Sequence, residues 1–133
     1  MPNLTHLFDL ANAARQNAYA PYSNFHVGAA IETQNGQIFA GCNVENAAYP
    51  IGTCAEAGAI SAMIASGERK IKHMVIIGSG SGACFPCGAC RQRIFEFSDR
   101  DTRIHVGSET GIVATPFTIA TLLPHSFNSG LLP

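Results

Sequence analysis

The chain has 133 residues, the length of one compact domain, so we expect a single domain over residues 1–133. Hydrophobic residues make up 47% of the sequence and charged residues 13%, a balance that excludes intrinsic disorder and predicts a packed core. Eight Lys and Arg against nine Asp and Glu give a formal net charge of −1, which argues against nucleic acid as a partner.

The N-terminal part of the chain predicts one helix and a hairpin of two strands. Apolar residues recur at helical spacing from Leu4 to Ala18, and Pro21 would end that helix. Apolar residues then alternate from Phe25 to Ile31, and the pair Asn35-Gly36 is a favoured two-residue turn. Because Ile38-Phe39-Ala40 resumes the apolar pattern, we expect two antiparallel strands.

The middle of the chain predicts two helices on either side of a buried strand. The segment 54–65 is rich in Ala, Ile and Met and precedes Gly67, as in a buried helix with a glycine at its end. Residues 74–77 are wholly apolar and lead into the glycine-rich loop 78–82, which indicates a central strand covered on both faces. A third helix is expected over 87–97, because Cys90, Ile94 and Phe97 share one face.

The C-terminal part predicts short elements only. Strands are expected over 103–106 and 112–115, and Thr118 would cap a short turn that ends before Pro124. The order helix, strand, strand, helix, strand, helix, strand indicates an α/β layer structure with a mixed sheet.

The cysteines and the apolar stretches bear on where the protein works. No apolar run approaches the ~18 residues that span a bilayer, and the N-terminus lacks a secretory signal pattern, so we expect a cytoplasmic protein that does not insert into membranes. Five cysteines in a reducing compartment are more consistent with thiols or metal ligands than with disulfides. The low charged fraction suggests that part of the surface is covered by other copies of the chain.

Two segments carry the chemistry: Cys54-Ala55-Glu56, and Pro86-Cys87-Gly88-Ala89-Cys90. Each is expected at a helix N-terminus, where the positive end of the helix lowers thiol pKa values. Zinc held by Cys54, Cys87 and Cys90 would keep its fourth position for water, as catalytic zinc sites do. A carboxylate at Glu56, in the first turn of a buried helix, needs a partner or a function.

Other interpretations of the same cysteines remain open. A lone Cys-x-x-Cys also fits a redox pair or half of a structural zinc site. Cys84 and Cys87 have the same spacing as Cys87 and Cys90, but the apolar face that begins at Cys90 favours the later pair. We interpret Cys42 and Cys84 as small buried side chains with inert thiols. The five histidines show no ligand spacing and are assigned ordinary core or surface roles.

The two motifs together match the all-cysteine form of the zinc nucleobase deaminase signature. The chain resembles the small homotetrameric cytidine deaminases over nearly its whole length, in segments 22–30, 43–50, 86–92 and 122–124. The resemblance implies a three-layer α/β fold with a mixed sheet of about five strands between helices. It also implies hydrolytic deamination of cytidine and 2'-deoxycytidine to uridine and 2'-deoxyuridine, with release of ammonia, in pyrimidine salvage.

The resemblance further implies a role for each matching residue. Zinc would be held by Cys54, Cys87 and Cys90, with Glu56 as the proton shuttle. The substrate would be a small nucleoside, with Asn43 and Glu45 on the ribose hydroxyls, Phe25 against the pyrimidine and the backbone of Ala55 at the edge of the base. Tyr49 and Phe127 would reach active sites across subunit interfaces of a homotetramer.

Several positions depart from the family pattern. Ala57-Gly58-Ala59 stands where Arg-Thr-Ala is frequent, and that arginine tempers the negative charge of three thiolates on one zinc. We hypothesise that the two helix N-termini, with Arg91, compensate in this chain. Phe85 replaces a small residue, and Phe127-Asn128-Ser129 replaces Phe-Gly-Pro, so the rim of the pocket and the range of substrates are expected to differ.

Three other functions are alternatives to cytidine deamination. Another cytosine-type or aminated heterocyclic nucleoside, such as a nucleoside antibiotic, fits the same chemistry. A polynucleotide-editing deaminase is disfavoured by the net charge and by cysteine at position 54, where such enzymes generally use histidine. A zinc-stabilised domain without enzymatic activity would leave Asn43, Glu45 and Glu56 without a role.

Overall fold

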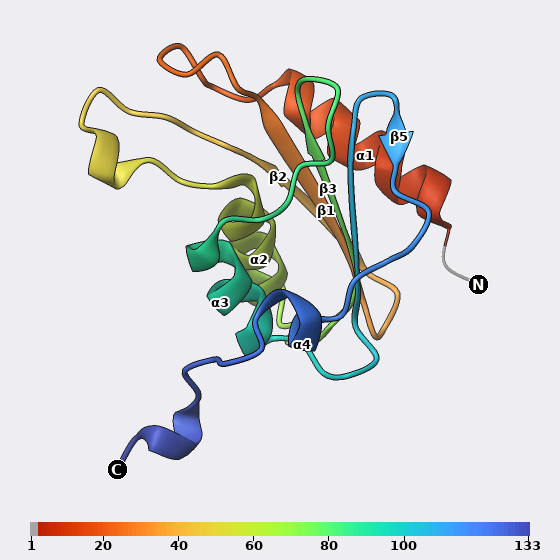
Figure 1. Cartoon of the computed structure of the whole chain (residues 1–133), viewed down its shortest axis with the longest axis vertical. Helices are drawn as coiled ribbons and strands as arrows, with labels where there is room; N and C mark the ends of the chain where they lie inside the picture. The colour runs from red at the N-terminus through yellow and green to blue at the C-terminus, as the bar shows by residue number, and fades with distance from the viewer. Residues whose placement is uncertain (1–2) are drawn as a thin grey trace.

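Five strands form one mixed sheet in the computed structural model, which describes residues 3–133 (Figure 1). Its order is β2-β1-β3-β4-β5; β3 and β4 run parallel, and the other neighbouring strands are antiparallel. The strands are β1 (Val27–Thr33), β2 (Ile38–Cys42), β3 (Ile71–Gly78), β4 (Arg103–Ser108) and β5 (Gly111–Ile112). The helices are α1 (Leu4–Gln16), α2 (Ala55–Ala65), α3 (Gly88–Glu96) and α4 (Ile119–Leu122), with short 3₁₀ turns η1 (Tyr49–Ile51) and η2 (Ser129–Leu131).

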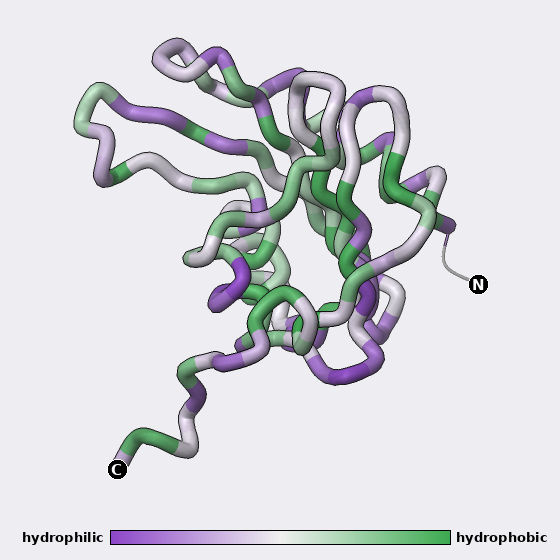
Figure 2. The backbone as a smooth tube through the Cα atoms, in the orientation of Figure 1, coloured by the Kyte–Doolittle hydropathy of each residue, from purple (hydrophilic) through white to green (hydrophobic). Residues whose placement is uncertain are grey.

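The sheet separates two apolar clusters, which makes three layers (Figures 1 and 2). On one face α1 buries Leu7 and Ala11 against Ala30 of β1 and against Val75 and Ile77 of β3. On the opposite face the larger cluster joins the sheet to α2, α3 and α4, through residues that include Ala59, Met63, Ile94, Ile119 and Leu122. β3 lies in the middle of the sheet and is buried on both faces, as its apolar run predicts. The expected α/β fold with a mixed sheet of five strands is therefore confirmed.

The ends of several elements differ from the sequence-based expectation. α1 stops at Gln16 because the following chain turns away and Tyr19 pairs with Val44 in an isolated bridge. β1 begins at Val27, so Phe25 lies in the preceding loop, directly after Asn24 with its positive φ of 57°. β5 is confined to Gly111–Ile112, and beyond it the chain stays beside β4 only through isolated hydrogen bonds, from Val113 to Val106 and between Phe117 and Ile104.

The contact between α2 and β2 depends on a glycine. A Cβ atom added to Gly41 would lie 2.6 Å from the carbonyl oxygen of Ala55 and 2.5 Å from the amide nitrogen of Ala59. Such distances are shorter than any ordinary packing contact, so only glycine lets the helix approach the strand this closely. Since Ala55 opens α2, this contact fixes the position of the N-terminal end of the helix.

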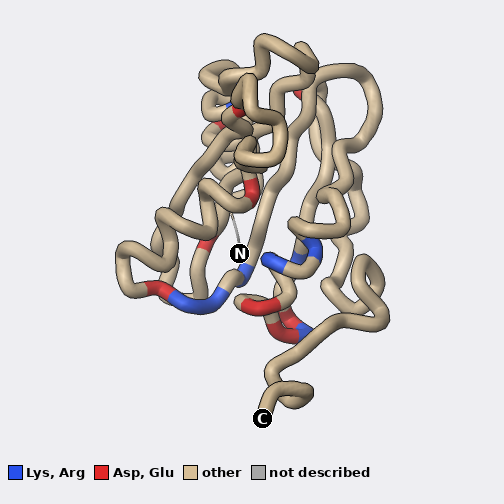
Figure 3. The backbone as a smooth tube through the Cα atoms, turned by 90° about the vertical axis from the view of Figure 1, so that its left-hand side faces the viewer, with Lys and Arg blue, Asp and Glu red and all other residues tan. Residues whose placement is uncertain are grey.

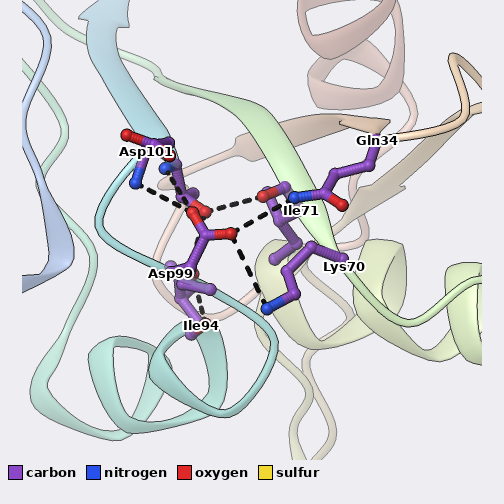
Figure 4. A network of polar contacts seen from close by, with 8 residues as sticks. Gln34, Lys70, Ile71, Ile94, Asp99 and Asp101 are labelled. Atoms are coloured by element: carbon purple, nitrogen blue, oxygen red, sulfur yellow. Dashed lines mark hydrogen bonds and ion pairs between the residues drawn. The ribbon is translucent and has the colours of Figure 1, made fainter.

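The loop between α3 and β4 is held by one carboxylate (Figure 4). Asp99 accepts hydrogen bonds from the backbone N–H groups of Asp101 and Thr102, at 2.8 and 3.1 Å. Its other oxygen accepts from Gln34 at 3.2 Å and lies 3.7 Å from Nζ of Lys70. The Asp99 network therefore joins this loop to the β1–β2 turn and to the start of β3.

Charged residues occupy a small part of the surface. In Figure 3 the Lys, Arg, Asp and Glu positions gather mainly near one end of the molecule, with long uncharged stretches between them. Large apolar side chains are exposed instead at several loops, including Tyr19, Tyr22, Phe25, Val44, Tyr49, Ile51, Phe85, Phe127, Leu131 and Leu132. Within residues 3–133, every helix is too short or too polar to cross a membrane.

Candidate functional site

The N-terminal ends of α2 and α3 bring three cysteines together. Cys54 is the N-cap residue of α2, Cys87 is the N-cap residue of α3, and Cys90 lies in the first turn of α3. The three sulfur atoms all lie within 4.8 Å of one another. Cys90 is buried, Cys54 is half-buried and Cys87 is exposed, so the cluster lies between the core and the surface.

The donor set and its spacing fit zinc. Tetrahedral zinc with Zn–S bonds of about 2.3 Å places its sulfur ligands roughly 3.8 Å apart, which small side-chain rotations would achieve here. Soft thiolates favour zinc over magnesium or calcium, which prefer oxygen ligands. In the described part of the chain, no second group of three His, Cys, Asp or Glu side chains is arranged to hold a metal. Three protein ligands also leave one tetrahedral position for another group.

The thiols have different protonation properties in the metal-free chain. Burial raises the pKa of the Cys54 and Cys90 thiols, and the negative charge of Glu56 acts in the same direction. Burial also acts to raise the pKa of the Cys87 thiol. Hydrogen bonds that involve Cys90 and Ala89 outweigh this effect, so the Cys87 pKa is lowered. Metal binding at neutral pH must therefore displace protons from the two more buried thiols.

Glu56 is buried beside the sulfur cluster. Glu56 is only 4% exposed and lies in the first turn of α2, two positions after Cys54. Burial raises the pKa of this carboxyl, which makes it easier to protonate than an exposed glutamate. A carboxyl group that is easier to protonate is better suited to accept a proton and return it, which is the property of a general acid–base group.

One cavity of about 190 Å³ gathers most of the residues that the motifs indicate. Its wall includes Cys54, Ala55, Glu56 and Cys87, together with the predicted substrate residues Phe25 and Asn43. Val27, Cys84 and Phe85 complete the lining. Carboxyl, thiol and amide groups thus face the same small space as two aromatic rings.

Asn43 holds the loop that carries Phe25. The Asn43 side-chain amide donates to the carbonyl oxygen of Phe25 at 2.9 Å, and its oxygen accepts from the N–H of Val27 at 2.8 Å. Behind Phe25, a Cβ added to Gly78 would come within 2.9 Å of the aromatic ring and 2.7 Å of the Cβ atom of Cys84. Phe25 therefore reaches the cavity because of the amide of Asn43, directly after β2, and the glycine at the end of β3.

Glu45, Tyr49 and Phe127 lie outside this cavity. Glu45 and Tyr49 line a second hollow of about 340 Å³, together with Tyr22, Ser23, Asn46 and Gly52. Glu45 accepts hydrogen bonds from the backbone N–H groups of Tyr22 and Ser23, at 2.9 and 3.1 Å, and from the Ser23 hydroxyl. The Ser23 hydroxyl contributes most to lowering the pKa of Glu45, which keeps this carboxylate ionised. Tyr49 is 74% exposed and Phe127 is 57% exposed, so neither is enclosed within a single chain.

The arginine contacts differ from the hypothesis about Arg91. Arg91 donates through Nε to the carbonyl oxygen of Pro86 and through Nη1 to that of Leu122, both at 2.9 Å. Arg93 instead places its Nη1 atom 3.5 Å from the sulfur of Cys90. Arg91 thus braces the loop before α3 against α4, and the contact to the cluster comes from Arg93, which sequence reasoning missed.

Cys84 lines the cavity, which the sequence did not predict. Burial and the nearby charge of Glu56 raise the pKa of its thiol to about 11, so the thiol is neutral at physiological pH. This agrees with the inert role expected for Cys84 and adds that the residue forms part of the cavity wall. Its neighbour Phe85 is 46% exposed at the same wall. The sequence signal that could have placed Cys84 and Phe85 in the cavity wall is their position directly before Pro86-Cys87.

Known proteins are similar to this chain in sequence and in fold. Residues 1–106 match the family model for the cytidine and deoxycytidylate deaminase zinc-binding region. The chain is 40% identical over 115 residues to a cytidine deaminase from Sporosarcina psychrophila, covering 86% of this chain and 84% of that protein. It is 35% identical over 125 residues to a cytidine deaminase from Mycobacterium tuberculosis, covering 92% and 88% of the two chains. A crystal structure of cytidine deaminase from Burkholderia pseudomallei superposes with a TM-score of 0.87 at 39% identity, covering 96% of this chain and 100% of the other.

Proposed function

Because this chain belongs to the cytidine and deoxycytidylate deaminase family, we infer that it removes the amino group of cytidine by hydrolysis. The observation that carries this inference is a cluster of three cysteine sulfurs within 4.8 Å of one another, of which Cys54 and Cys87 line a cavity that Glu56 also lines. We assign the whole chain, residues 1–133, to one catalytic domain.

Cys54, Cys87 and Cys90 are the proposed ligands of a zinc ion. Zinc held there would lower the pKa of a coordinated water from about 16 toward 7, which makes hydroxide available at neutral pH. The N-terminal ends of α2 and α3 stabilise the thiolates, since each presents the positive end of its helix to the cluster. Burial of Cys90 shields one side of the cluster from solvent, while Cys87 leaves another side exposed.

Glu56 is the proposed proton carrier. The carboxylate takes a proton from the attacking water and delivers it to N3 of cytosine while the oxygen bonds to C4. It then takes the remaining proton from the new hydroxyl group on C4 and gives it to the amino group as the bond from C4 to that nitrogen breaks, which releases ammonia and leaves the C4 carbonyl of uridine. Burial of Glu56 supports this role, because it raises the pKa of the carboxyl group and so makes proton uptake easier.

Phe25, Asn43, Glu45 and Ala55 are the proposed substrate contacts for cytidine and 2'-deoxycytidine. Phe25 and Ala55 line the cavity, where an aromatic ring can stack on the pyrimidine and backbone groups can meet its polar edge. Asn43 and Glu45 supply polar groups suited to the ribose hydroxyls. Their hydrogen bonds to the 22–27 loop would orient those groups before the substrate arrives.

A second substrate class remains a candidate because of Phe85. This exposed aromatic side chain occupies the cavity wall directly before Pro86-Cys87, and the added surface would favour a modified cytosine or another aminated heterocycle. Ammonia release measured against a panel of nucleosides separates the two classes. Cytidine as the best substrate supports the main proposal, and a modified nucleoside turned over faster would replace it.

We also propose that the protein assembles as a homotetramer, acts in the cytoplasm on free nucleosides and contributes to pyrimidine salvage. Exposure of Tyr49 and Phe127 supports assembly, since both are large apolar side chains without an enclosed environment in one chain. Free cysteine ligands support a reducing compartment. A net charge of −1 supports a small substrate over a nucleic acid.

The test of this function is the substitution Glu56→Gln. It removes the titratable oxygen and keeps the shape of the side chain, so turnover of cytidine should fall by at least about 10²-fold with zinc still bound. Absorbance at the ultraviolet bands of cytidine and uridine measures the turnover, and metal analysis measures the zinc.

A matched control is Glu96→Gln, which makes the same change at an exposed position of α3. We expect this variant to retain full activity. Full activity in the Glu56→Gln protein would contradict the mechanism, and failure of the unmodified protein to release ammonia from any cytosine nucleoside would contradict the function.

A further inference from the structure

Three thiolates around one Zn²⁺ leave a net negative charge at the edge of the core. The N-terminal ends of α2 and α3 offset part of it, because each carries about half a positive charge. Ala57, in the first turn of α2, is uncharged and contributes none. The remaining charge needs a cation from another part of the chain.

The cation that reaches the cluster comes from α3. Arg93 follows Cys90 by three residues, a spacing that places two side chains next to each other on a helix surface. Cys90 points into the core and Arg93 lies on the exposed side, with Nη1 3.5 Å from the Cys90 sulfur. An N–H donor from a guanidinium at this distance forms a charge-assisted hydrogen bond when the sulfur is a thiolate.

The other arginine of α3 is occupied elsewhere. Both donor contacts of Arg91 go to backbone carbonyl oxygens, those of Pro86 and Leu122. Further cations within residues 3–133 also have contacts away from the cluster: Arg15 with Glu109, Arg69 with the carbonyl of Ile64, Lys70 with Asp99, and Arg103 with the carbonyl of Arg100. In the described chain, Arg93 is the residue whose cationic side chain makes a hydrogen bond to a cysteine sulfur.

We propose that Arg93 is a positioning residue of the zinc site, which strengthens metal binding by holding its cation against the Cys90 sulfur. This inference rests on the proposed zinc site and concerns how this chain neutralises it. The guanidinium is exposed, so solvent and salt screen its charge, and the effect is modest.

The experiment measures the dissociation constant for zinc by competition with a chelator. Arg93→Met keeps much of the apolar stem and removes the charge, and we expect the variant to bind zinc about three- to tenfold more weakly at low ionic strength. Arg93→Lys retains a cation and should recover part of the loss. The difference between Arg93→Met and the unmodified protein should shrink in 1 M NaCl, where the Debye length is about 3 Å.

Arg69→Met is the matched control. It removes the same charge from an exposed arginine whose guanidinium contacts only backbone carbonyls, so zinc affinity should not change. Thermal unfolding of the metal-free proteins distinguishes an electrostatic role of Arg93 from a structural one. If the role were purely structural, Arg93→Met would lower the melting temperature of the metal-free protein.

Equal zinc affinity in Arg93→Met and the unmodified protein would overturn the inference. So would a loss of affinity that Arg93→Lys does not reduce and that salt does not change. Either result leaves the proposed deaminase function intact, because that function is tested by cytidine turnover in the unmodified enzyme and in Glu56→Gln. Conversely, an unmodified protein that binds zinc but does not deaminate cytidine would leave the Arg93 inference standing.

Discussion

His73 and His105 form a buried pair on neighbouring strands, β3 and β4. Nδ1 of His73 lies 3.2 Å from Nε2 of His105, and the two rings are tilted by 31°. Burial lowers the pKa of both, and the charge of His73 and Arg103 helps to bring that of His105 to about 4. At His73 the charges of Lys72 and Arg103 act with burial, while Glu32 opposes them. Both histidines are therefore neutral at pH 7 in the folded protein.

This pair should make stability depend on pH in the acidic range. As the pH falls from about 6.5 toward 4, histidines in the unfolded chain bind protons that the folded chain resists, so the free energy of unfolding decreases. Substitution His105→Gln removes one of these groups and should flatten the decrease. Urea unfolding at pH 7 and pH 5 measures the difference, and an equal decrease in both proteins would contradict the prediction.

The residues of the site differ in how far the sequence could predict them. Cys54, Glu56, Cys87 and Cys90 follow from short-range spacing at two helix starts, because a helix N-terminus places such residues at one end of its axis. Arg93 could not be found in this way, since its contact depends on the direction of a long side chain across α3. The roles assigned to Cys54, Glu56, Cys87 and Cys90 remain predictions, as do those assigned to Phe25, Asn43, Glu45 and Ala55.

Gly41 determines where helix α2 lies against strand β2. Overpacking a tight contact costs about 1–3 kcal/mol, so Gly41→Ala should lower the free energy of unfolding by roughly that amount. Because α2 carries Cys54 and Glu56, a displaced helix should also weaken zinc binding. Chemical denaturation and metal analysis measure both effects.

Gly82→Ala is the control for this prediction. A Cβ at Gly82 meets no atom within 4 Å, so the substitution should leave stability and zinc binding unchanged. Equal behaviour of the two variants would show that α2 can shift without cost.

Periodicity predicted the core elements better than their ends. The apolar patterns of β1 and β3 correctly predict two strands, and β1 is buried on both faces although its large apolar residues alternate. The C-terminal limit of α1 depends instead on Tyr19, which pairs with Val44 from a distant loop. The sequence near the end of α1 does not indicate which distant residue will pair there. The length of β5 is equally hard to predict, because it is set by pairing with β4.

The whole molecule presents its exposed apolar side chains on loops that project from the sheet. In Figure 1 the segment that contains η1 and the C-terminal segment that contains η2 both extend away from the layers. Tyr49 lies in η1, and Phe127 directly precedes η2. Burial of these side chains against other copies is a physical reason for the proposed tetramer, because a few large apolar groups dominate most interfaces.

Charged substitutions at these positions test the assembly. Phe127→Asp should reduce the mass measured by light scattering below that of a tetramer, and cytidine turnover should fall with it. Val113→Asp is the control, since Val113 is also exposed but lies beside the short strand β5. An unmodified protein that is monomeric and fully active would contradict the proposed assembly.

The sulfur cluster also makes the metal-free protein sensitive to oxidation. Three thiols within 4.8 Å of one another include an exposed Cys87 whose pKa is lowered, which is the combination that reacts fastest with an oxidant. Loss of two electrons and two protons from a pair of these thiols would join them as a disulfide and remove two ligands at once. Metal removal under air thus converts a reversible loss of zinc into a covalent inactivation, which only a reductant reverses.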